Sequence, residues 1–143
     1  MSGRFHFQDN PDGAAELAAL LDDSGVPYDR AGNHFELLFT KESRTWRTVC
    51  SCEGGRVLIY GIHPQPAADL TAALTVCSDV NRQMVQGACF LTQERIVCRT
   101  GAELSEPFTA RELLAQALEY NAAVISHFWE ALEAGASGSG HFN

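Results

Sequence analysis

The hydrophobic and polar positions along the chain change their period several times, and each period predicts a different element. Over residues 11–24 the apolar side chains recur at helical spacing, at Ala14, Leu17, Ala18 and Leu21. This pattern predicts a helix with one apolar stripe. Asn10 is placed to cap its start, Pro11 suits its first turn, and Gly25 supplies the left-handed residue that ends many helices.

The next segment alternates apolar and polar residues with a period of two. This predicts strands over residues 34–41, 46–52 and 56–62, and a short edge strand over 26–28. The short polar turns between them favour an antiparallel meander. Alternation assigns five apolar side chains to the sheet face that a two-layer fold leaves less covered: Leu38, Val49, Leu58, Tyr60 and Ile62.

Helical spacing returns over residues 67–84 and predicts a second helix. Two strands are expected over 88–92 and 95–99, and their connection is short enough for a hairpin. A long helix is expected over 109–134, with its apolar stripe at Leu114, Leu118, Ile125, Phe128 and Leu132.

The start of the long helix has a specific local signature. Thr109 and Glu112 have the spacing of a capping box, in which each side chain satisfies the other residue's backbone donor. Phe108 and Leu113 have the spacing of a hydrophobic staple. Both signals predict that the helix begins at Thr109.

The order of these elements predicts an α+β fold. Helices that follow runs of antiparallel strands pack on one face of the sheet, so we expect a two-layer sandwich with the order α-β-β-β(-β)-α-β-β-α. A chain of 143 residues suits one domain, which we place at 11–134. Residues 1–10 and 135–143 are expected to be flexible ends, because they are polar or rich in Gly and Ser.

Composition argues against two classes of partner. The chain carries 10 Lys+Arg against 18 Asp+Glu, a formal charge of −8. Nucleic acids and anionic membranes are bound through clustered basic residues, so neither is an expected partner. We find no secretory signal and no apolar run long enough for a membrane span, and we therefore expect a cytoplasmic protein.

Five cysteines and five histidines are the main candidates for chemistry. Cys50 and Cys52 are too close in sequence for a zinc knuckle, and an odd number of cysteines favours free thiols in a reducing compartment. The histidines form no HxH or HExxH pattern. No nucleophile motif such as GxSxG is present. We therefore expect no metal, no cofactor and no catalytic residue.

The stretch from Leu74 to Leu91 is an apolar helix that ends in Asn81, followed by a short polar link and a strand with a small residue before an aromatic one. With the strand at 95–99 and the closing helix, it resembles the YbjN family of bacterial proteins. That family shares a fold with the class I type III secretion chaperones. The resemblance spans about residues 12–134 and implies a small acidic homodimer that acts by binding other proteins.

Two asparagines lie on apolar helix faces and leave alternatives open. For Asn81 we favour a side-chain cap on the loop that leads to Cys89 over recognition of a ligand. Asn121 is either a buried hydrogen-bonded residue or a polar contact in a helix-mediated dimer. The face of the sheet is either covered by a helix or is a binding or dimer surface.

We therefore expect a non-catalytic, chaperone-like or regulatory module that forms a homodimer and presents apolar surfaces to an unidentified protein partner. The alternatives are a regulatory domain that binds a small ligand and, less favoured, an enzyme of unrecognised type. The candidate partner or dimer surface comprises Leu38, Val49, Leu58, Tyr60, Ile62, Asn81, Asn121 and Trp129.

Overall fold

The computed structural model describes residues 11–138 and contains one six-stranded antiparallel sheet. The strands lie in the order β1-β2-β3-β4-β6-β5. Their bounds are β1 Asp29–Ala31, β2 His34–Lys41, β3 Arg44–Glu53, β4 Arg56–Ile62, β5 Ala88–Thr92 and β6 Arg95–Glu103. The helices are α2 Gly13–Ser24, α3 Leu70–Gln83, α4 Ala110–His127 and α5 Trp129–Ser137.

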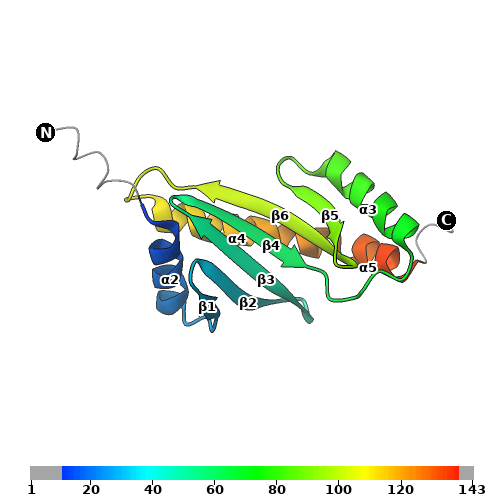
Figure 1. Cartoon of the computed structure of the whole chain (residues 1–143), viewed down its shortest axis with the longest axis horizontal. Helices are drawn as coiled ribbons and strands as arrows, with labels where there is room; N and C mark the ends of the chain where they lie inside the picture. Colours follow the sequence, from blue (N-terminus) through cyan, green and yellow to red (C-terminus); the bar gives the residue numbers. More distant parts are fainter. Residues whose placement is uncertain (1–10, 139–143) are drawn as a thin grey trace, which may run out of the picture.

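The four helices within residues 11–138 all pack against one face of this sheet, and α4 and α5 run behind it in Figure 1. The α+β sandwich with an antiparallel sheet is therefore confirmed. Two core clusters fill the space between the layers. The first joins α2 and the start of α4 to the sheet through side chains such as Leu17 and Phe35. The second joins α3, α5 and the end of α4 to it through side chains such as Cys77 and Trp46.

Three expected strands have different bounds in the structure. Strand β3 is longer at both ends, Arg44–Glu53 in place of 46–52. The edge strand is Asp29–Ala31, not 26–28, because Gly32 and Asn33 form the turn that folds it back on β2. Strand β6 continues to Glu103, beyond its expected end at residue 99. It does so because residues 97–103 pair with β4, from Val97 opposite Ile62 to Glu103 opposite Arg56.

The starts of the helices partly follow their sequence signals. Asp12 caps α2 by accepting a hydrogen bond from the Ala14 N–H at 3.3 Å, whereas Asn10 lies outside the described residues. The prediction of a capping box at Thr109 is wrong, because this residue has helical backbone angles and its side chain makes no capping hydrogen bond. The staple is wrong too, because Phe108 is 97% exposed.

The long C-terminal helix is two helices. It breaks at Phe128, and α5 then runs to Ser137, beyond the expected end at Ala134. Gly135, expected to begin a flexible tail, is buried in α5 instead, since a Cβ on it would lie 2.7 Å from the Val76 side chain of α3. Residues 139–143 of the expected tail lie outside the described residues.

Candidate interaction surface

The face of the sheet opposite the helices carries a connected group of apolar side chains. Leu38 is 66% exposed, and the other four expected residues, Val49, Leu58, Tyr60 and Ile62, are half-buried. Strand register connects them, because Val49 lies opposite Tyr60 and Ile62 lies opposite Val97. We call this group, with Phe90 and Val97, the open face. No helix among the described residues packs on it.

Sequence reasoning missed Phe90 and Val97. Val97 lies between Ile62 of β4 and Phe90 of β5, so the apolar row crosses three strands. The alternation of β5 and β6 is the signal that assigns both side chains to this face, because Cys89, Ile96 and Cys98 point into the core. Val97 itself is buried, with 3% of its surface exposed.

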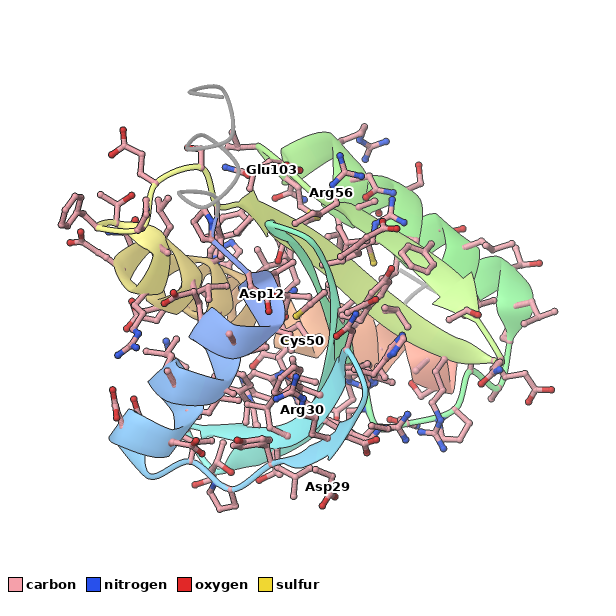
Figure 2. All side chains as sticks on the ribbon, turned by 60° about the vertical axis from the view of Figure 1, so that its left-hand side comes forward. Asp12, Asp29, Arg30, Cys50, Arg56 and Glu103 are labelled. Carbon is pink, nitrogen blue, oxygen red and sulfur yellow. The ribbon has the colours of Figure 1, made fainter. Side chains whose placement is uncertain are left out.

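Charged side chains surround the apolar part of the open face. Arg47 Nε bonds to Glu36 Oε2 at 3.0 Å, and Arg56 Nε bonds to Glu103 Oε2 at 2.7 Å. Figure 2 shows Arg56 and Glu103 side by side at one end of the sheet. The Arg99 guanidinium lies 5.4 Å from the centre of the Phe90 ring. These pairs are exposed, so each adds little to stability, but they give the face a mixed polar border.

Asn81 closes the β5 edge of the sheet. Its Oδ1 accepts from the Cys89 N–H at 2.6 Å, and its Nδ2 donates to the Cys89 carbonyl at 2.9 Å. The preferred interpretation of Asn81 as a side-chain cap is therefore confirmed. The two bonds take up the outward backbone groups of an edge residue, which otherwise attract another strand.

Asn121 and Trp129 are core residues in this chain. Asn121 is 1% exposed and donates from Nδ2 to the Ile59 and Cys98 carbonyls, both at 3.1 Å, so the structure supports its buried alternative. Gly61 permits this approach of α4, since a Cβ there would lie 2.1 Å from Ile125 Cδ1 and 2.6 Å from Asn121 Oδ1. Trp129 is 8% exposed, so neither residue contributes to a free surface.

Three buried side-chain polar atoms have no hydrogen-bond partner within residues 11–138: Trp46 Nε1, Thr48 Oγ1 and His63 Nε2. The Trp129 ring centroid lies 5.7 Å from that of Trp46 and 4.8 Å from that of His63. Burial lowers the pKa of His63, which is 1% exposed. The histidine is therefore a neutral core residue at neutral pH.

All five cysteines are buried free thiols, so the expectation of free thiols is confirmed. Burial, followed by the nearby Cys52, raises the pKa of Cys50 to about 12. A hydrogen bond with Cys89, together with burial, raises the pKa of Cys77 above its usual range. Such thiols are poor nucleophiles and poor metal ligands. Within residues 11–138, no three His, Cys, Asp or Glu side chains are placed to hold a metal ion.

Comparison with solved structures identifies the architecture. The chain superposes on the crystal structure of YbjN from E. coli, a proposed transcription regulator, with a TM-score of 0.59. The match covers 85% of this chain and 90% of YbjN at 19% sequence identity. The chain has a YbjN-like fold. The resemblance seen in the sequence is thus confirmed at the level of the fold.

No protein-family model matches the sequence, and neither does any of the curated proteins compared with it. The YbjN-like fold therefore rests on the three-dimensional match. None of the helices within residues 11–138 is both long and apolar enough to cross a membrane.

Proposed function

We propose that this protein is a non-catalytic regulatory module whose open face binds a partner protein. The observation that carries the proposal is the uncovered sheet face, with Leu38 exposed and Tyr60 and Ile62 half-buried beside it. An apolar patch with a polar border is characteristic of a protein-binding surface. A regulatory role agrees with the description of YbjN, the structural neighbour.

The acidic charge favours a protein over a nucleic acid as the partner. Regulation through direct DNA binding requires a basic surface, whereas this chain has a formal charge of −8. On the open face, Arg47 and Arg56 are already paired with carboxylates. A module of this kind acts on transcription or transport through the protein that it binds.

The same face is the proposed interface of a homodimer in the absence of the partner. Two copies related by a two-fold axis bury the same patch on each other. Light scattering coupled to size exclusion is then expected to give twice the chain mass of 15.6 kDa. Tyr60→Asp places a charge in this interface and is expected to give the single-chain mass.

Partner binding is tested by capture from the host extract with matched variants. Tyr60→Asp alters the open face, and Leu74→Asp replaces an exposed leucine of α3, away from the sheet. We expect proteins that the wild type and Leu74→Asp retain and that Tyr60→Asp loses. If the three baits retain the same proteins in the same amounts, the open face is not the binding surface.

A further inference from the structure

One half of strand β2 has an unpaired edge. β1 pairs only with His34–Glu36, and among residues 11–138 no strand lies beside Leu37–Lys41 on that side. The opposite edge of the sheet is closed at Cys89 by Asn81. Residues 37–40 of β2 include no Pro and no charged side chain, two of the devices that prevent strand pairing at an edge, and Lys41 follows at the end of the strand.

The register shows which backbone groups this edge offers. The Cys52 N–H donates to the Asn33 carbonyl at 2.9 Å, so Asn33 directs its hydrogen-bonding groups toward β3. In an antiparallel pair this direction alternates along the strand. Every second residue from Asn33 therefore bonds to β3, and Leu38 and Thr40 direct their N–H and C=O groups away from the sheet.

Two hollows follow this edge. One, of about 330 Å³, lies between the sheet edge, α2 and α4, and its apolar lining includes Leu20, Val26, Phe39 and Leu118. The other, of about 390 Å³, separates Pro27 and Tyr28 from Leu37 and Leu38. An extended chain that lies beside β2 directs alternate side chains to the two faces of the sheet, so one set of them enters the apolar hollow.

The free charges that line the two hollows are acidic. Glu119 lines the first hollow and Asp29 lines the second, and neither lining includes a Lys or Arg. Glu36, which also lines the second hollow, is paired with Arg47. Asp29 projects from the sheet at this edge in Figure 2. A second copy of this acidic chain is therefore a poor occupant, while a basic segment is electrostatically favoured.

We propose that the β2 edge binds an extended segment of the partner protein by strand addition, and that this segment alternates apolar residues with Lys or Arg. The inference rests on the proposed function, because it names the chemistry of the partner. Backbone bonds at Leu38 and Thr40 supply the pairing, the apolar hollow selects the side chains on one face, and Asp29 and Glu119 favour the positive charge.

A defined probe tests this directly. The probe is the labelled peptide Lys-Val-Thr-Val-Lys-Val, with both ends blocked, and binding is measured by fluorescence anisotropy. Two isomers are N-methylated at alternate residues, one on each edge of the extended peptide. We expect one isomer to lose binding at least about tenfold and the other to retain it, because only one edge faces β2.

Variants of the protein supply the complementary arm. Thr40→Pro removes the outward N–H, and Thr40→Ala removes the same side chain, with its bond to Thr45 Oγ1, while keeping that N–H. We expect Thr40→Pro, but not Thr40→Ala, to weaken binding of the probe peptide at least about tenfold. Glu119→Lys is also expected to weaken binding of the probe. Glu112→Lys, on the same helix but outside the hollow, is expected to leave binding unchanged.

Several outcomes overturn the proposal. They are equal binding by Thr40→Pro and Thr40→Ala, equal binding by the two methylated isomers, or no saturable binding to wild type below about 1 mM. Loss of a dimer in Thr40→Pro assigns the edge to a second copy instead. The isomers are tested on the wild type, so the result does not depend on the folding of a variant. Tyr60→Asp should still bind the probe. A result against the open face as a binding surface is therefore distinguished from a result against strand addition at the β2 edge.

Discussion

The side chain of Asn81 and the backbone of Cys89 form a closed pair of hydrogen bonds, at 2.6 and 2.9 Å. The amide at the end of α3 thus takes the place of a neighbouring strand at one position of the β5 edge. Helix α3 and the edge strand are joined through polar groups here, beside the apolar contacts of Cys77 and Val80.

Asn81→Ala is expected to destabilise the fold by about 1–3 kcal/mol, because it leaves the N–H and C=O of Cys89 without partners. Urea unfolding followed by circular dichroism measures the change. Gln83→Ala is the control, since Gln83 lies on the same helix and makes only one exposed bond, to the Asp79 carbonyl. An equal loss in both variants would show that the bonds to Cys89 add nothing.

Gly61→Ala is expected to destabilise the fold by about 1–3 kcal/mol, because its methyl group meets Ile125 and Asn121 of α4. Gly101→Ala is the matched control on β6, where a Cβ would lie 3.2 Å from Leu58 Cδ2 on the open face. Thermal unfolding of both variants gives the comparison. If Gly61→Ala is as stable as the wild type, α4 is not held against β4 as closely as the structure has it.

His63 is expected to make stability depend on pH. Its pKa in the folded state is lowered by burial, so below about pH 6.5 the unfolded chain binds more protons than the folded one. Glu133 opposes this effect, and Arg95 adds to it. Stability should therefore fall as the pH drops through this region.

His63→Leu removes that contribution, so the difference in unfolding free energy between about pH 7.5 and pH 5.5 should be smaller than in the wild type. Urea titrations at the two values give the difference for each protein. A pH dependence that is identical in both proteins would mean that His63 does not titrate between them.

The thiols should be protected in the folded state. The raised pKa values of Cys50 and Cys77, together with burial of all five cysteines, predict slow reaction with iodoacetamide at neutral pH. Mass spectrometry should find unmodified protein under native conditions and five modified cysteines in urea. Rapid labelling of one cysteine under native conditions would instead locate a region that opens readily.

The β2–β3 turn offers a route to greater stability. Glu42 and Ser43 both have positive φ, 54° and 68°, which suits Asn-Gly far better than these residues. Replacing them by Glu42→Asn and Ser43→Gly is expected to stabilise the fold by about 0.5–1 kcal/mol. A lower melting temperature in the double variant would show that these side chains contribute interactions that outweigh their backbone strain.

Local patterns in the sequence predicted the sheet faces well, because alternation is set by the backbone. Leu38, Val49 and Tyr60 all lie on the face that this pattern assigned to them. Helix ends were harder, since the signal at Thr109 satisfies a rule of spacing but the chain enters α4 in another conformation. The break at Phe128 follows from packing against α3, which no local pattern records.

The candidate site likewise has parts that local sequence patterns predict and parts that depend on how the elements pack together. The open face follows from alternation, whereas the free edge of β2 depends on where β1 stops pairing, which is a relationship between two strands. Trp129 and Asn121 were both included in the candidate surface, with a buried position left open for Asn121. Their burial follows from the close approach of that helix to Gly61 and from the new direction of α5.

The contact between the tilted rings of Trp46 and Trp129 has a practical consequence for any spectroscopic study. These are the two tryptophans of the chain, and both belong to the core cluster beneath α3 and α5. Intrinsic tryptophan emission therefore reports on that half of the molecule alone. If the half built around Leu17 and Phe35 were to loosen first, the emission would not change, whereas the tyrosine signal of Tyr28, which packs on Phe35, would record it.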